Sequence, residues 1–336
     1  MTTTREKAPT RAPAATQGVN YDPNAAPAQP APAQASPTSP ANAPAASAPA
    51  ASTPAGPPKR PGPKPATAAP PATKPTQQSL AKVSFAKVGQ GSGHRVALFG
   101  PGGVGKTTLA CTAPGTVAMF DLDESLPRLR GKFAAWQVDE PVVIPNINTF
   151  ADVANALNAD GWDGIKTIAI DSTSKLEELA IAHVLATVKM QDGSTAANIE
   201  AYGYGKGYQH VYDVFNTLFP ILDRHTRAGR NVILVCHECT SDVPNPRGPE
   251  WKRYEPRLQT SSSGKASIRL RLKEWVDHML FIGYDIDVAK DGVAKGSGTA
   301  TVYPRELPFA MAKSRTMTDP VSLEEAVWGL WPKLLV

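Results

Sequence analysis

Short apolar runs alternate with amphipathic stretches through most of the chain. Four runs bounded by polar or turn residues are predicted to be buried strands, at 96–99, 116–120, 166–171 and 231–236. Helical patterns cover 149–160, 172–189 and 207–227. Strands that alternate with helices favour a mainly parallel sheet flanked by helices on both faces, which is an α/β fold.

The C-terminal part of the chain has weaker patterns. They predict a long polar loop at 240–266, a late strand and hairpin at 276–289 and 298–303, one more strand at 308–313 and a closing helix at 321–330. A short lead-in strand is expected at 83–88. Ligands of parallel sheets bind at the carboxyl ends of the strands, so polar residues at those ends are the candidates for chemistry.

The first 80 residues have a different composition. They contain 19 Pro and 22 Ala, with one Val, one Leu, one Tyr and no Ile, Phe or Trp. Such a segment cannot bury enough apolar surface to offset its ordering entropy, so residues 1–80 are predicted to be a disordered tail. We expect the tail to act as a spacer, and residues 81–336 to form one folded domain.

The formal charge of +5 belongs to the tail, which has seven Lys/Arg and two Asp/Glu. Residues 81–336 have 28 of each, so a nucleic-acid site in the folded domain must be a local patch. Three cysteines, two of them in a lone C-x-x-C at 236–239, fit a reducing cytosol better than a disulfide framework or a zinc site. No run of 18 apolar residues and no signal peptide is present, so a cytoplasmic location is expected.

The stretch RVALFGPGGVGKTTLA at 95–110 fits the pattern G-x-x-x-x-G-K-[ST] in a strand–loop–helix context. Its glycines let backbone N–H groups surround a phosphate. Lys106 is predicted to reach the β- and γ-phosphates of ATP, and the Thr107 hydroxyl to hold Mg²⁺. The alternative is a glycine-rich turn before an ordinary helix. The expected nucleotide-binding residues are Gly100, Pro101, Gly102, Gly103, Val104, Gly105, Lys106, Thr107 and Thr108.

Polar residues also follow the other predicted strands. Asp171 ends an apolar run, as a Walker B carboxylate does, and is predicted to hold the Mg²⁺ shell. The alternative is an aspartate that merely caps the helix that follows. Asp123 and Glu124 are candidates to orient an attacking water, the alternative being a solvated acidic turn. His237 could sense the γ-phosphate or be an ordinary histidine at a strand end.

Lys313 and Arg315 lie late in the folded part. Two cations one residue apart on a strand point to the same face. They could stabilise transition-state charge across a subunit boundary, as arginine fingers do. Two surface cations near a turn are the alternative.

Basic and aromatic residues mix in the stretch 247–273, which has eight Lys/Arg against two Glu. Cations that follow a backbone and rings that stack on bases suit single-stranded DNA. A solvated basic loop is the alternative. The candidate DNA-binding residues are Arg247, Trp251, Lys252, Arg253, Tyr254, Arg257 and Lys265.

The segments GPGGVGKTT, VAMFDLDESL, TIAIDSTSKLEEL, NVILVCHE, EWVDHMLFI and AKSR together resemble the RecA-like ATPases of phages. More narrowly, they resemble the Sak-type group, which is linked to single-strand annealing and recombination. The resemblance covers residues 93–316 and implies a RecA-like P-loop core that hydrolyses ATP with Mg²⁺. It implies a catalytic carboxylate at Asp123, a γ-phosphate sensor at His237 and the K-x-R pair of hexameric relatives at Lys313 and Arg315.

The resemblance also implies partners: single-stranded DNA, a single-strand-binding protein and further copies of the chain in a ring-like oligomer. Two other classes stay open. A ParA/MinD-like switch shares GGVGKTT, but its signature lysine would fall at Pro101. A small-molecule or nucleotide kinase would need an arginine-rich lid and an acceptor pocket that the sequence does not identify.

Overall fold

A computed structural model describes residues 93–261, 265–288 and 294–335 of the chain. The predicted tail, the lead-in strand at 83–88 and the serine-rich stretch 262–264 lie outside these residues. Within them, the strands form one mixed sheet of order β3-β2-β4-β5-β1-β7-β8-β9, with β6 paired to β5. The strands are β1 (Arg95–Gly100), β2 (Thr116–Asp121), β3 (Val142–Val143), β4 (Ile165–Asp171), β5 (Asn231–Val243), β6 (Trp251–Pro256), β7 (His278–Val288), β8 (Ala294–Tyr303) and β9 (Val321–Ser322).

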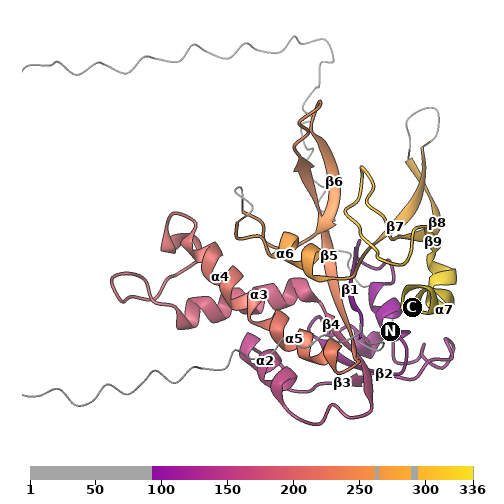
Figure 1. Cartoon of the computed structure of the whole chain (residues 1–336), viewed down its shortest axis with the longest axis horizontal. Helices are drawn as coiled ribbons and strands as arrows, with labels where there is room; N and C mark the ends of the chain where they lie inside the picture. The colour runs from indigo at the N-terminus through magenta and orange to yellow at the C-terminus, as the bar shows by residue number, and fades with distance from the viewer. Residues whose placement is uncertain (1–92, 262–264, 289–293, 336) are drawn as a thin grey trace, which may run out of the picture. The chain divides into compact units, whose positions relative to one another are not determined.

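Helices cover both faces of this sheet, and α7 lies on the opposite side of the central strands from α2–α5 (Figure 1). The α-helices are α1 (Lys106–Cys111), α2 (Phe150–Asn158), α3 (Thr173–Thr187), α4 (Lys206–Asn216), α5 (Leu218–Arg227), α6 (Ile268–Trp275) and α7 (Leu323–Leu334). Short 3₁₀ turns occupy Leu126–Arg128 and Glu200–Tyr202. The architecture confirms the predicted α/β class, with a mainly parallel sheet flanked by helices. None of the described helices is long and apolar enough to cross a bilayer.

The central strand β1 is buried on both faces because its side chains alternate between two cores. Ala97 and Phe99 pack with α2–α6, whereas Val96 and Leu98 pack with α1 and α7. Strands covered on both faces consist of nearly continuous apolar residues, which is why these runs could be recognised in the sequence.

The parallel register brings the carboxyl ends of four strands to one edge. Gly100 at the end of β1 lies opposite His237 on β5, and Asp171 at the end of β4 lies opposite Asp121 on β2. The strand β5 separates β1 from β4. The loops that follow β1, β2 and β4 therefore open over the same side of the sheet.

The prediction of a polar loop at 240–266 is wrong for the part that forms the end of β5 and all of β6. The strand β5 continues to Val243 and pairs antiparallel with β6, from Glu238 opposite Pro256 to Val243 opposite Trp251. This hairpin projects beyond the sheet edge (Figure 1). Most of its side chains are exposed or only partly buried, so the strands lack the apolar alternation that would have identified them. The helix α6 was missed as well.

Two other expectations need correction. The single helix predicted at 207–227 is two helices, because Pro220 has no N–H to continue the backbone ladder from α4 into α5. The segment 308–313 is not a regular strand. It makes isolated bridges, with Ala310 beside Tyr254 and Lys313 beside Met279.

Candidate active site

The loop between β1 and α1 needs glycine at two positions. Gly100 has φ 156°, and a Cβ there would lie 2.1 Å from the carbonyl oxygen of Ile282 on β7. Gly105 has φ 107°, and its Cβ would come within 3.0 Å of Leu323 on α7. The loop is thus packed tightly between β7 and α7, with backbone conformations that other residues rarely adopt.

Lys106 is the buried cation of this loop. Its Nζ donates to the carbonyl oxygens of Gly100 at 2.8 Å and Pro101 at 2.7 Å. Burial lowers the pKa of this ammonium, while the nearby Asp171 carboxylate opposes the shift. The backbone carbonyls of the loop therefore hold the ammonium in place. A bound anion would stabilise its positive charge.

Thr107 and Asp171 form a pair of oxygen donors beside Lys106. The Thr107 hydroxyl donates to Asp171 Oδ2 at 2.5 Å. Burial raises the pKa of Asp171 to about 6, and the hydrogen bond from Thr107 opposes that rise. A hydroxyl and a carboxylate are the oxygen ligands that Mg²⁺ takes in P-loop sites, so the donor set fits this metal. A cation here would also offset the cost of burying the carboxylate.

Asp123 faces the end of β5. Its Oδ2 lies 3.0 Å from Nε2 of His237, and its amide donates to the Asp171 carbonyl at 3.2 Å. The hydrogen bond with His237 lowers the pKa of Asp123, while burial opposes the shift. Glu124 sits in a left-handed turn with φ 52°, and its exposed side chain makes no ion pair with the described residues. The structure thus brings Asp123, rather than Glu124, to His237.

Three hydrogen bonds join this pair to the end of β6. The amide of His237 donates to Ser174 Oγ at 3.1 Å, and the Ser174 hydroxyl donates to the carbonyl of Arg257 at 3.0 Å. The amide of Arg257 donates back to the carbonyl of His237 at 2.8 Å. The role of Ser174 had no sequence signal beyond its place after Asp171.

Lys313 and Arg315 lie away from the P-loop of the same chain. Lys313 Nζ donates to the carbonyls of Lys273, Glu274 and Val276, at 3.0, 3.3 and 2.7 Å, and so caps the end of α6. Arg315 Nε donates to Asp277 at 3.0 Å. Asp277 precedes β7, and β7 runs parallel to β1. The Arg315–Asp277 pair therefore lies at the amino ends of these strands, whereas the P-loop lies at their carboxyl ends.

Most predicted DNA-binding cations already have acidic partners. Lys252 pairs with Asp242 at 2.7 Å, Arg257 with Glu178 at 3.7 Å, and Arg253 with Glu255 and with Glu306. These pairs neutralise much of the basic excess that the sequence shows.

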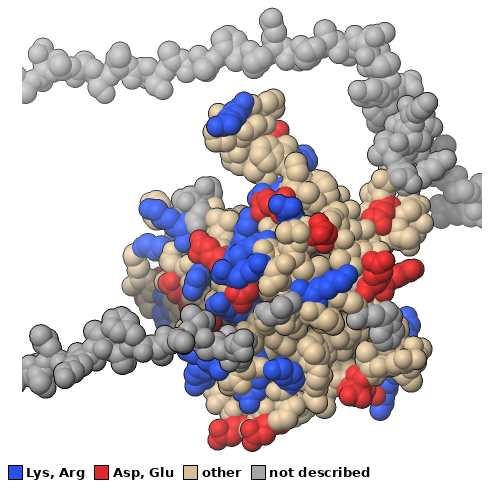
Figure 2. Space-filling model, turned by 45° about the vertical axis from the view of Figure 1, so that its right-hand side comes forward, with Lys and Arg blue, Asp and Glu red and all other residues tan. Residues whose placement is uncertain are grey.

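The remaining candidates differ in exposure. Trp251 is partly exposed and its indole donates to the carbonyl of Pro308 at 2.6 Å, while Tyr254 stacks on Phe281. Arg247 and Lys265 are exposed and form no ion pair with the described residues. Positive atoms lie at the tip of the projecting β5–β6 hairpin (Figure 2). Arg247, between β5 and β6, and Lys265 are therefore the candidate DNA-binding cations without an acidic partner among the described residues.

The P-loop geometry and the sheet define a P-loop NTPase, and comparison with known proteins agrees. Residues 92–316 match the family described as AAA domain, which spans more than half of the chain. The chain belongs to this AAA-domain family. No curated protein sequence matches it.

A KaiC-like protein from the hyperthermophilic archaeon Pyrococcus horikoshii is similar in structure, with 16% identity and a TM-score of 0.35. The match covers 69% of this chain and 85% of that protein.

Replacing Asp171 by Asn is expected to separate stability from activity. The raised pKa means that the buried carboxylate is costly at pH 7, so the neutral amide should stabilise the fold, by on the order of 2 kcal/mol. The same change removes the charge that would attract Mg²⁺, so magnesium-dependent nucleotide binding should be lost. Chemical denaturation and titration of Mg²⁺ with a fluorescent ATP analogue measure the two effects. Unchanged metal dependence would contradict the assignment.

Proposed function

We propose that this protein is a magnesium-dependent ATPase that acts on single-stranded DNA as a homo-oligomer. The observation that carries the proposal is the meeting of Lys106, the Thr107–Asp171 pair and the Asp123–His237 pair at one sheet edge. The finer role, in phage recombination, annealing or replication, rests on the motif resemblance.

Each group has a role that its chemistry supports. The amides of the P-loop and Lys106 bind the phosphates, and Thr107 and Asp171 would hold Mg²⁺, which neutralises phosphate charge. Asp123, kept ionised by its hydrogen bond with His237, orients the attacking water. His237 contacts both this carboxylate and the backbone of Arg257. A movement of His237 in response to the γ-phosphate would therefore be transmitted to the end of the β5–β6 hairpin.

The three hydrogen bonds among His237, Ser174 and Arg257 offer a route for coupling to DNA. A shift of His237 would change the ring that fixes Arg257, which directly follows β6. DNA held by the β5–β6 hairpin could bias the same contacts from the other side. Such linkage is reciprocal: if ATP changes the affinity for DNA, then DNA changes the affinity for ATP.

The direct test is ATP hydrolysis by the full chain with and without single-stranded DNA. We expect hydrolysis that requires Mg²⁺ and rises with DNA, and no hydrolysis by Lys106→Ala, because the γ-phosphate then lacks its main cationic partner. Activity of Lys106→Ala at the wild-type level would rule out the P-loop assignment. Transfer of the γ-phosphate to a small acceptor instead of water would favour a kinase.

Among the hairpin cations, we expect Arg247 to contribute more to DNA binding than Lys252. Arg247 is uncompensated, whereas Lys252 is bound to Asp242. Arg247→Ala should weaken binding of single strands and reduce the slope of log K against log salt concentration by about 0.7 if one phosphate contact is lost. Lys252→Ala is the matched control and should change the slope less. Equal slopes in wild type and Arg247→Ala would place the DNA elsewhere.

We further propose that Arg315, rather than Lys313, acts in the active site of a neighbouring subunit. Lys313 is committed to three backbone carbonyls, so Lys313→Ala should mainly lower stability. Arg315→Ala should bind ATP normally but hydrolyse it about 10³-fold more slowly. Mixing Arg315→Ala with Lys106→Ala should restore some activity at the intact interfaces. A mixture that exchanges subunits and stays inactive would exclude a role in trans.

A further inference from the structure

A cavity of about 530 Å³ lies between the β5–β6 hairpin and the β7–β8 hairpin. It adjoins the nucleotide loop, because Pro101 forms part of its wall. Tyr284 on β7, another wall residue, has its hydroxyl 3.4 Å from the carbonyl oxygen of Gly102 and donates to it. The cavity thus opens directly beside the P-loop. Two of its wall residues, Pro101 and Tyr254, are candidate nucleotide-binding and DNA-binding residues, and the other wall residues have no role assigned above.

The walls of the cavity are aromatic. Tyr254 stacks on Phe281 with ring centroids 5.3 Å apart and planes 12° apart, and Phe281 stacks on Tyr303 at 6.0 Å and 24°. Phe309 packs edge-on against Tyr303 at 5.5 Å, and it stays 44% exposed. An ordered set of rings with an open member at its rim is a surface on which a flat ligand can stack.

The charged groups of the cavity are acids. Glu238 and Asp285 belong to the wall, and no Lys or Arg does. The Oε2 atom of Glu238 is buried and accepts no hydrogen bond from the described residues. Asp285 accepts a hydrogen bond from the Thr299 hydroxyl at 2.7 Å through Oδ2, and its second carboxylate oxygen can accept an N–H group of a ligand in the cavity. A phosphate would be repelled by both carboxylates.

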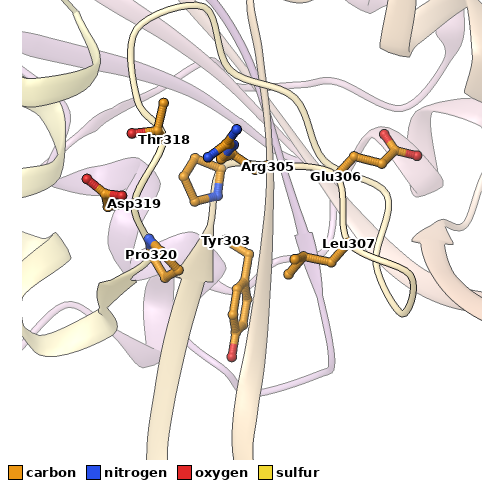
Figure 3. Close-up of a pocket in the computed structure, with 8 residues that line it drawn as sticks. Tyr303, Arg305, Glu306, Leu307, Thr318, Asp319 and Pro320 are labelled. Atoms are coloured by element: carbon orange, nitrogen blue, oxygen red, sulfur yellow. The ribbon is translucent and has the colours of Figure 1, made fainter.

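A second pocket, of about 370 Å³, shares Tyr303 with this cavity. Figure 3 shows Arg305 on one side of this pocket and Thr318 and Asp319 on the other. Arg305 is exposed and forms no ion pair with the described residues. The pocket also holds two carboxylates, those of Asp319 and Glu306, and Glu306 already pairs with Arg253 and Lys273, so Arg305 does not give this pocket a net positive charge.

The nucleoside of the P-loop ATP is not suited to this place. The cavity wall includes Glu238, which directly follows His237, the residue assigned to the γ-phosphate. The Lys106 ammonium acts electrostatically on the Glu238 carboxylate, so this wall adjoins the phosphate-binding end of the site, whereas the nucleoside of ATP is attached at the other end of the triphosphate. The ligand is therefore a separate molecule that sits next to the reacting phosphate.

We propose that the aromatic cavity receives one unstacked base of single-stranded DNA. The inference rests on the proposed function and deepens it, because it places a DNA contact against the P-loop itself. Stacking supplies the affinity, and the carboxylates accept hydrogen bonds from exocyclic amino groups, as Glu and Asp do from cytosine. Adenine and cytosine should therefore be preferred to thymine, which has no such amino group.

The test uses the full chain and a single-stranded oligonucleotide carrying one 2-aminopurine, a fluorescent base that is quenched by stacking. Phe309→Ala should reduce the quenching and weaken binding about tenfold, within the range for loss of one stacked base. Val143→Ala is the matched control, because Val143 is an exposed apolar residue on β3 at the far edge of the sheet. It should behave as wild type. Asp285→Asn should reduce the preference of oligo(dA) and oligo(dC) over oligo(dT).

Each contrary outcome is informative. Wild-type quenching and affinity in Phe309→Ala would overturn the base site while leaving DNA binding intact. If Phe309→Ala instead abolishes self-association and leaves oligonucleotide affinity unchanged, the cavity takes a peptide of a second copy and the proposal is wrong. If the wild-type chain hydrolyses ATP but binds no oligonucleotide, both this inference and the proposed DNA role fail. Basal hydrolysis without DNA, measured in the same samples, shows that the P-loop is intact.

Discussion

The parallel placement of β5 between β1 and β4 is the constraint on which the candidate site depends. It sets Gly100 opposite His237 and places the end of β4, with Asp171, one strand further along. Backbone pairing therefore fixes the spacing of the P-loop, the Thr107–Asp171 pair and the candidate sensor before any side chain is positioned. A slip of one residue in β5 would turn His237 to the other face of the sheet and break its contact with Asp123.

This arrangement buries charge that would be better solvated elsewhere. Burial raises the pKa of Asp171 to about 6 and lowers the pKa of Lys106, so each group is held in the state that its pocket disfavours. A nucleotide with a divalent cation would relieve both, because it brings negative charge to Lys106 and positive charge to Asp171. Relief of these two disfavoured charges would contribute to the free energy of nucleotide binding. Groups with perturbed pKa values are common at functional sites for this kind of reason.

The sequence predicted the buried part of the fold better than its exposed part. The P-loop, Asp171 and the four apolar strands could be recognised because their signals are local: glycines where φ is positive and apolar runs buried on both faces. The β5–β6 hairpin could not, since its strands face solvent and its polar composition resembles a loop. The capping role of Lys313 and the ion pairs that occupy Arg253 depend on long-range contacts, for which a single sequence has no signal.

We propose that one contact, between Asp123 and His237, links ATP hydrolysis to the β5–β6 hairpin. The most direct test compares the ATPase rates of wild type, Asp123→Asn, His237→Asn and the double variant, each with and without single-stranded DNA. We expect His237→Asn to keep measurable basal hydrolysis but to lose its stimulation by DNA, and the double variant to be no slower than Asp123→Asn alone. Full DNA stimulation in His237→Asn, or losses that simply add in the double variant, would contradict the claim.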